Sequence, residues 1–376
     1  MDTKVLIIGG GISGLHTAYT LAQQGIDCKL LEARPRLGGR IMSRNWQQAD
    51  YTDSLPAYDM GPAWFWPGQS HMENLVQELG LTESVFMQQE TGDAVYENAE
   101  GKIVRGIQGI SMAGSYRMRG GNAQLISALE KGLPADTVML NALVTQLEYI
   151  DAQESGIRAS VTLDGKPITL NCEAVVIAAP PRVAVEQICF VPALPEPRIT
   201  VLNGVQTWMA GHAKLLAFYD TPFWLEQGFS GDCVSQVGPM HEIHDASPAG
   251  DGPAALFGFM GVPAVHRGDQ QALKQAAIAQ LVRLFGEQAA TPLDIYFKDW
   301  AKDPLTATAL DQEMMTSHPS NDIQQIVEAG WLQRLIWSGT ETAPNGSRFN
   351  GYLEGALEAS VRAVSELLKA PDLKLK

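Results

Sequence analysis

The chain has 376 residues, of which 45% are hydrophobic, and its 42 acidic and 27 basic side chains give a formal net charge of −15. This length exceeds the size at which a single hydrophobic core usually stops growing, so we expect two domains. The acidic surplus excludes nucleic acid and anionic membranes as expected partners, and it weakly favours a cationic small molecule.

The first elements in the chain form the pattern of a nucleotide-binding unit. Residues 5–8 are four consecutive apolar residues, which predicts a strand buried on both faces of a parallel sheet. A glycine-rich turn leads into a predicted helix over residues 12–24, and Gly25 is its expected stop. Residues 28–31 predict a second strand that ends in Glu32.

Three glycines make this turn suitable for a dinucleotide. After Gly9 in the tight turn, Gly11 lets the backbone approach a pyrophosphate, and Gly14 allows close packing of helix and strand. The first residues of the helix, Ile12 and Ser13 among them, offer free N–H groups to the phosphates. Glu32 is the expected acceptor for the ribose hydroxyls.

A second glycine pair follows in residues 33–40, where Gly38 and Gly39 precede Arg40. This string resembles the extension found in FAD enzymes of the glutathione-reductase-like type, especially the flavin amine oxidases. The resemblance implies that the glycine pair passes under the flavin side of FAD. It also implies that Arg40 contacts the pyrophosphate region and that Ala33 and Arg34 lie near the adenosine.

The resemblance to the flavin amine oxidase family extends over most of the chain. It implies a segment along the isoalloxazine ring, a helix start, a backbone contact to adenine, a strand ending in proline and a terminal cofactor block. The residues that match are Asp59, Gly61, Pro62, Ala63 and Trp64, then Gly120, Gly121, Leu125 and Leu129, then Val144, then residues 174–181, and finally residues 338–343 and 350–356.

The terminal block has two parts. Gly339, Thr340 and Glu341 follow a predicted strand over residues 335–337, and Gly351, Tyr352 and Leu353 start a predicted helix. The helix would point N–H groups, with Leu353 as the favoured donor, at the flavin edge where negative charge develops on reduction. The alternative interpretation is a glycine-rich turn into an alanine-rich core helix.

Lys214 is the candidate catalytic residue of the second domain. It interrupts an apolar strand pattern over residues 213–219, and a buried lysine is costly without a partner or a task. In the family the matching lysine holds a water against flavin N5, beside a tryptophan that Trp300 matches. The alternative is a lysine on an exposed strand edge.

The resemblance also implies how the substrate is held. Many amine oxidases sandwich the substrate nitrogen between two aromatic rings, of which Tyr352 matches one, while the other position falls near Leu310. The position at which some members tether FAD through cysteine falls at Ala309, and no cysteine follows Cys233, so we expect noncovalent FAD. Flavin amine oxidation needs little acid–base chemistry, and we therefore expect no general base.

Other features of the sequence have plainer interpretations. His241 and His244 could ligate zinc if they lay on a helix, but the prolines and glycine that flank them favour a polar loop. The four cysteines, Cys28, Cys172, Cys189 and Cys233, show neither metal-binding spacing nor a disulfide framework. Without a signal peptide or a stretch of about 18 apolar residues, the sequence predicts a cytoplasmic protein with no transmembrane anchor.

Together these features predict an α/β fold with a discontinuous Rossmann-like FAD-binding domain and an inserted α+β substrate domain. We assign residues 1–72, 118–197 and 297–376 to the first and residues 73–117 and 198–296 to the second. Compared with the family, the chain is short between His71 and Tyr116, which implies a more open site, a bulky substrate or a partner that completes the surface.

The predicted function is that of an FAD-dependent, amine oxidase-like enzyme. A hydride equivalent would pass from a substrate C–H next to nitrogen to flavin N5, and O2 would reoxidise the flavin with release of H2O2. Two alternatives stay open. One is a desaturase or protoporphyrinogen-oxidase-like enzyme acting on a larger molecule, and the other is a catalytically idle FAD-binding protein that acts through a partner.

Overall fold

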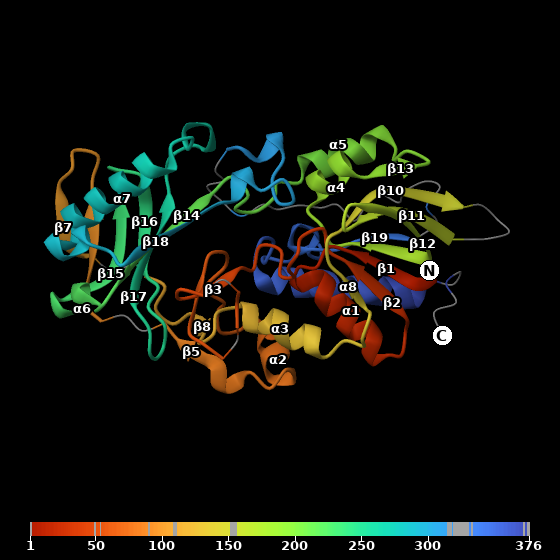
Figure 1. Cartoon of the computed structure of the whole chain (residues 1–376), viewed down its shortest axis with the longest axis horizontal. Helices are drawn as coiled ribbons and strands as arrows, with labels where there is room; N and C mark the ends of the chain where they lie inside the picture. The colour runs from red at the N-terminus through yellow and green to blue at the C-terminus, as the bar shows by residue number, and fades with distance from the viewer. Residues whose placement is uncertain are drawn as a thin grey trace.

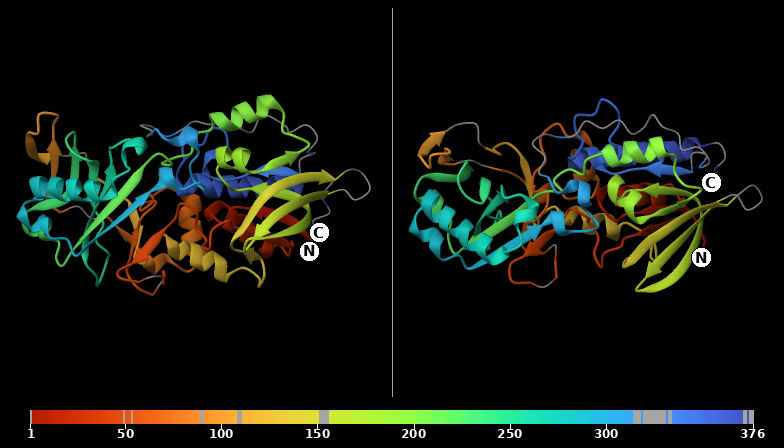
Figure 2. Two further views of the ribbon diagram at one scale, coloured as in Figure 1. Left: turned by 45° about the horizontal axis from the view of Figure 1, so that its top comes forward. Right: turned by 90° about the horizontal axis from the view of Figure 1, so that it is seen from above.

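The computed structural model describes residues 2–48, 50–52, 54–88, 91–107, 111–150, 156–313, 318, 331, 334–370 and 373. The molecule is elongated, with one large β-sheet toward each end and smaller elements between them (Figure 1). Figure 2 shows the same two-part arrangement from two further directions.

The larger sheet contains the predicted nucleotide-binding strands. Strand β1 pairs in parallel with β12 on one side and with β2 on the other, whereas β11 pairs antiparallel with β10 and β12. In spatial order its described strands are β13 (Cys189–Val191), β10 (Ala142–Ile150), β11 (Gly156–Leu163), β12 (Lys166–Ile177), β1 (Asp2–Ile8), β2 (Cys28–Leu31) and β9 (Val138–Met139), and β19 (Leu335–Trp337) pairs in parallel with β12.

Strand β1 is buried on both faces, as its apolar run predicts. Val5 and Ile7 pack in one core with helices α1 (Ile12–Gln23), α3 (Ala123–Lys131) and α8 (Leu353–Lys369). Leu6 and Ile8 pack in a second core on the opposite face. Helices α1 and α8, from opposite ends of the sequence, lie side by side against this sheet (Figure 1).

The second sheet forms the other end of the molecule. Helix α7 (Gln270–Phe285) packs on one of its faces, and the opposite face packs against Tyr58 and Met60 from the first part of the chain. In spatial order its described strands are β18 (Asp294–Asp299), β14 (Ala213–Tyr219), β17 (Ala254–Met260), β16 (Met240–Asp245), β15 (Phe229–Ser235), β6 (Asp93–Glu97) and β7 (Ile103–Ile107).

Short elements connect the two sheets. The remaining strand pairs are β3 (Ser43–Asn45) with β4 (Ala57–Asp59) and β5 (Val85–Met87) with β8 (Tyr116–Met118). The remaining α-helices are α2 (Ser70–Glu78), α4 (Pro181–Gln187), α5 (Glu196–Gly204) and α6 (Phe223–Glu226). The 3₁₀ turns are Thr82–Ser84, Ala264–His266, Glu287–Ala290, Trp300–Lys302, Ala309–Asp311 and Thr340–Thr342.

The predicted strand–turn–helix–strand unit is confirmed: β1 leads into α1, and β2 ends directly before Glu32. The prediction of a polar loop at His241 and His244 is wrong, because these residues lie in strand β16. The prolines and glycine that flank this segment lie outside the strand, where they break no ladder hydrogen bond.

The division into two domains at the stated boundaries stays a proposal. Two contacts bear on where such boundaries would run. Met72, Leu75 and Val76 of helix α2 pack in the same core as α8, and Leu202 of α5 packs in the core of the larger sheet. Within the described residues, none of the helices is long and apolar enough to cross a membrane.

Gly14 should be essential for the packing of this fold. A Cβ atom at Gly14 would overlap the carbonyl oxygen of Gly9, which is part of the rigid turn. We predict that Gly14→Ala lowers the free energy of unfolding by about 2 kcal/mol or more, because backbone rather than a flexible side chain must move.

Denaturant unfolding of the apoprotein measures this loss. Gly268→Ala is the matched control, because a Cβ atom there meets no heavy atom within 4 Å. Equal stabilities of the Gly14→Ala and Gly268→Ala proteins would contradict the packing argument.

Candidate active site

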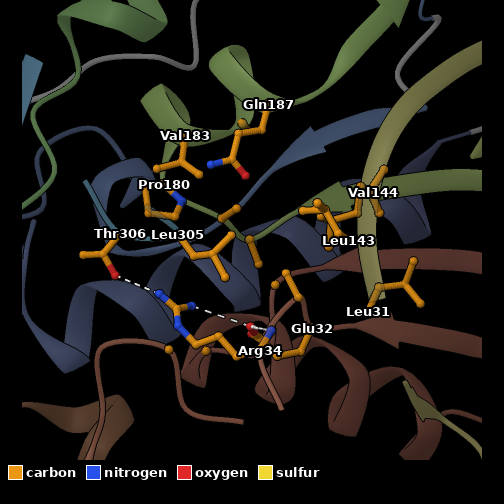
Figure 3. Close-up of a pocket in the computed structure, with 18 of the residues that line it drawn as sticks. Leu31, Glu32, Arg34, Leu143, Val144, Pro180, Val183, Gln187, Leu305 and Thr306 are labelled. Atoms are coloured by element: carbon orange, nitrogen blue, oxygen red, sulfur yellow. Dashed lines mark hydrogen bonds and ion pairs between the residues drawn. The ribbon is translucent and has the colours of Figure 1, made fainter. Parts of the chain in front are cut away.

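A pocket opens at the carboxyl ends of β1, β2 and β12, where parallel α/β sheets usually bind their ligands. Its wall includes Gly9, Gly11, Glu32 and Val144, and it extends to Gly39 and Arg40. Figure 3 shows Glu32 and Arg34 on one side of this pocket and Val183 and Gln187 of helix α4 on the other. Most of the predicted nucleotide-binding residues therefore surround one space.

Glu32 is held rigidly at the pocket wall. It is 3% exposed, and its two carboxylate oxygens accept hydrogen bonds from the backbone N–H groups of Gly10 and Arg34, both at 2.8 Å. The Arg34 guanidinium donates to Asp303 at 2.7 Å and to Thr306 at 2.9 Å, and it lies 3.6 Å from a Glu32 oxygen; the contacts with Thr306 and Glu32 are drawn in Figure 3. This arrangement leaves the carboxylate with further lone pairs for two hydroxyl donors.

Arg40 joins the two cofactor motifs that lie farthest apart in the sequence. Its guanidinium donates to both carboxylate oxygens of Glu341, at 2.5 and 2.9 Å, and Glu341 is 1% exposed. Burial lowers the pKa of Arg40, but the Glu341 carboxylate more than offsets it, so the pKa is raised overall. Arg40 also donates to the carbonyl oxygen of Trp208 at 3.1 Å.

A second link between the chain ends lies at the start of helix α1. The Ser13 hydroxyl lies 2.8 Å from the Ser338 hydroxyl and accepts a hydrogen bond from the Gly339 N–H at 3.0 Å. Thr340 donates to the carbonyl oxygen of Tyr352 at 2.7 Å, which fixes the start of helix α8 against the same block. The terminal motifs thus form one continuous hydrogen-bonded unit.

The second sheet reaches this unit through two side chains. The Lys214 ammonium on β14 donates to the carbonyl oxygen of Gly61 at 3.2 Å, and the Trp300 indole donates to the carbonyl oxygen of Met60 at 3.2 Å. Both therefore converge on the segment that the sequence predicts along the isoalloxazine ring. The expected alternative of an exposed-edge lysine is wrong, because Lys214 is 2% exposed and β14 lies between β17 and β18.

The surroundings of Lys214 disfavour its charged form. Burial lowers the pKa of the ammonium from 10.5 to about 7, the Asp59 carboxylate raises it in part, and the Arg117 guanidinium lowers it. Burial likewise raises the pKa of Asp59, although hydrogen bonds from Ser43 and Asn122 oppose that shift. The Lys214 ammonium also lies 3.9 Å from the centre of the Phe257 ring.

The ring of Tyr352 lies in a stack of three rings. It is 4.2 Å from the His318 ring, which in turn is 3.7 Å from the Trp208 ring, with interplanar angles of 12° and 25°. Leu310, where the sequence places the second aromatic position, is 59% exposed and sits in a 3₁₀ turn. Its carbonyl oxygen accepts a hydrogen bond from Arg182.

The residues present fit a flavin dinucleotide. The pocket offers an acidic ribose acceptor, glycines without side chains and the N-terminus of helix α1, and beyond it lie Lys214 and the start of α8. Of the other predicted residues, Ile12, Ser13 and Gly14 form the first turn of α1. In the sequence, Gly38 lies close to Arg40, and Pro62, Ala63 and Trp64 follow Gly61. Cys28, Cys172, Cys189 and Cys233 lie in β2, β12, β13 and β15, outside the pocket wall.

Sequence reasoning missed several residues of this region. Asp59 was used only to recognise a motif, although its buried carboxylate is a charged neighbour of Lys214. Phe257 and Arg117 come from segments without a recognisable motif. Trp208 and His318 could not be assigned, since nothing in the sequence indicates that they approach Tyr352.

Comparison with known proteins agrees with this site. A family model described as "Flavin containing amine oxidoreductase" matches residues 12–109 and 108–368. Putrescine oxidase from Kocuria rosea is 24% identical over 99% of this chain and 96% of its own, and flavin-containing amine oxidase A from Sus scrofa is 24% identical over 97% and 85%. The first alignment extends over 488 positions, so that relative has segments which this chain lacks.

Solved structures show the same fold. A structure of putrescine oxidase bound to putrescine matches with a TM-score of 0.79 and 21% identity over 98% of this chain and 99% of that one. Cyclohexylamine oxidase from Brevibacterium oxydans matches with a TM-score of 0.78 and 22% identity over 97% and 98%. The chain therefore belongs to the flavin-containing amine oxidoreductase family, and it is an amine oxidase-like oxidoreductase with FAD as its noncovalently bound cofactor.

Proposed function

We propose that the protein oxidises a small-molecule amine at the carbon next to nitrogen and uses O2 as the electron acceptor. Bound FAD would supply the redox chemistry, accepting a hydride equivalent at N5 and passing the two electrons to O2, which is reduced to H2O2. The observation that supports this proposal most is the convergence of Lys214 and Trp300 on the backbone of residues 60 and 61.

The protein's own groups would hold the amine and exclude water. The Lys214 ammonium lies 3.9 Å from the Phe257 ring centre and 5.9 Å from that of Phe259, and the Trp64 ring packs against Phe257 with ring centres 5.2 Å apart, which makes an aromatic wall. In such an apolar setting an amine is favoured in its neutral form, which has the nitrogen lone pair that the oxidation requires. This wall makes a dedicated general base unnecessary.

Two groups would act at the flavin end. Lys214, whose ammonium already donates to the Gly61 carbonyl, would hold a water or proton donor beside the reacting atoms. The N-terminus of helix α8, with the Leu353 N–H as donor, would stabilise negative charge that develops during reduction. Gly339, Gly351 and Tyr352 position that helix start, and the Tyr352 ring is the candidate substrate contact.

Anaerobic titration of the oxidised holoprotein with a panel of amines tests the reaction. We predict that at least one amine bleaches the visible absorbance band of the oxidised flavin. Admission of O2 should restore this band and release H2O2. Bleaching identifies an amine donor and separates amine oxidation from desaturation of a larger molecule. A holoprotein that retains FAD but is reduced by no amine would contradict the proposal.

Replacing Lys214 tests its placement through stability as well as rate. Lys214 has a lowered pKa in the folded state, so folding is penalised in full below about pH 7 and less as the pH rises toward 10.5. We predict that Lys214→Met raises the unfolding midpoint at pH 6 relative to the native protein, and that this gain shrinks by pH 9. In the same variant, flavin reduction or reoxidation should slow at least tenfold while FAD remains bound.

The control is Lys102→Met, because Lys102 is exposed and precedes strand β7, at the edge of the same sheet opposite β18. A pH-independent stability difference for Lys214→Met, with unchanged flavin kinetics, would remove Lys214 from the site.

A further inference from the structure

Arg267 is a buried arginine that has no role in the reaction described above. Its side chain is 0% exposed and directly follows the 3₁₀ turn Ala264–His266. Its guanidinium donates through Nε to the Val262 carbonyl oxygen at 2.7 Å, through Nη1 to the Asp299 carboxylate at 2.7 Å and through Nη2 to the Gly211 carbonyl oxygen at 2.6 Å. One rigid, planar group therefore joins the segment before β14 to the end of β18.

These two segments carry the side chains that reach the proposed flavin site. Gly211 lies three residues before Lys214, and Asp299 lies directly before Trp300. Strands β14 and β18 pair antiparallel, and the Trp300 N–H donates to the carbonyl oxygen of His212 at 3.0 Å. Arg267 thus fixes the backbone from which both side chains extend to the carbonyl groups of residues 60 and 61.

Two more hydrogen bonds tie the turn of Trp300 to this arginine. The Asp299 oxygen that binds Arg267 also accepts the Ala301 N–H at 3.2 Å, which begins the 3₁₀ turn Trp300–Lys302. At the other end of that turn, the Lys302 ammonium donates to the backbone carbonyl oxygen of Arg267 at 3.0 Å. The backbone of Trp300 cannot shift without breaking several of these hydrogen bonds.

The pair of Arg267 and Asp299 is a poor source of stability. The two side chains are 0% and 3% exposed, so both charges have lost their water. The Oδ2 atom of Asp299 is buried without a hydrogen-bond partner among the described residues. A buried ion pair with an unsatisfied oxygen adds little stability compared with apolar residues of the same size. What the pair does supply is a defined geometry, because the donors of a guanidinium lie in one fixed plane.

The same sheet contains a second arginine–carboxylate pair that offers a comparison. Arg283 of α7 donates to both oxygens of Glu97 on β6, at 2.6 and 3.0 Å, and Glu97 is fully buried. Three strands separate β6 from β14, so a substitution of Arg283 disturbs the sheet far from Lys214 and Trp300.

We infer that Arg267, acting through Asp299, is a positioning residue that sets where the Trp300 indole and the Lys214 ammonium lie in the flavin site. This inference rests on the proposed function, which takes these two side chains as groups beside the flavin. A misplacement of about 1 Å in such a site can cost about a hundredfold in rate. Lysine at position 267 would keep the charge but lack the planar fork, so it would not hold the three acceptors in the same arrangement.

The test variants are Arg267→Lys and Asp299→Asn, and Arg283→Lys is the matched control. Rates are measured on the FAD-loaded proteins well below their unfolding midpoints, so that a loss of stability alone changes none of them. We expect Arg267→Lys to slow flavin reduction by the best amine, and reoxidation of the dithionite-reduced flavin by O2, each by about tenfold or more, with both within about twofold in Arg283→Lys.

Asp299→Asn keeps the shape and the hydrogen-bond acceptor, so it gives the same measurement if Arg267→Lys does not fold. It should slow the same steps as Arg267→Lys. The double variant should be little slower than the slower single variant, because both substitutions remove one contact.

The visible circular dichroism of bound FAD gives a readout that needs no turnover, because it reports the arrangement of groups around the flavin. It should change in Arg267→Lys and stay unchanged in Arg283→Lys. Unchanged rates and dichroism in Arg267→Lys and Asp299→Asn, equal losses in Arg283→Lys, or additive losses in the double variant would overturn the positioning role. If no amine reduces the flavin, but reoxidation and dichroism change in Arg267→Lys alone, the proposed reaction is wrong and the positioning role stands.

Discussion

The ion pair between Arg40 and Glu341 is the interaction on which the rest of this structure depends. It joins the second glycine-rich motif to the terminal cofactor block, two segments separated by about three hundred residues of sequence. Glu341 is buried and the Arg40 side chain is 26% exposed, so removal of Arg40 would leave a buried carboxylate without its charged partner. Helices α1 and α8 pack side by side (Figure 1), so the chain ends are held together by both charge and apolar contact.

The second sheet contributes the Lys214 side chain, and the Trp300 side chain follows its strand β18, where the two parts of the molecule meet. Its inner face is largely apolar, with Leu216, Phe218 and Phe257 packed on Tyr58 and Met60. Charged groups on that face are expensive unless they have partners or tasks. Two sets of charged side chains nevertheless lie on this face. Lys214 donates to the backbone carbonyl of residue 61, and the cluster around His244, with Asp232 and Glu242, lies at a distance of two strands from Lys214.

Much of the fold could be predicted from the sequence, because local patterns determine it. The apolar run of β1, the glycines after it and Glu32 after β2 follow from backbone geometry and burial, and they appear in the expected order. Lys214 in β14 and the start of α8 at Leu353 were likewise placed correctly from local patterns. The strand at His241 and His244 was missed because flanking prolines indicate where a segment ends, not what it is.

The contacts between distant segments could not be predicted in the same way. Nothing local indicates that Arg40 pairs with Glu341, or that the ring of His318 lies between Trp208 and Tyr352. The charged cluster of Asp232, His244 and Glu242 depends on the register between the two strands β15 and β16, which a one-residue shift would abolish. Such sites follow from tertiary packing, and the sequence shows only that their residue types are available.

A double-mutant cycle between Arg40 and Glu341, measured on FAD dissociation from the holoprotein, tests most directly whether the two chain ends build one cofactor site. Arg40→Met and Glu341→Gln should each weaken FAD binding. The loss of binding free energy in the double variant should be far smaller than the sum of the losses in the two single variants. The account predicts a coupling free energy of at least about 1 kcal/mol, within the range of residues in direct contact. Strictly additive effects, or single variants that retain FAD as tightly as the native protein, would contradict it.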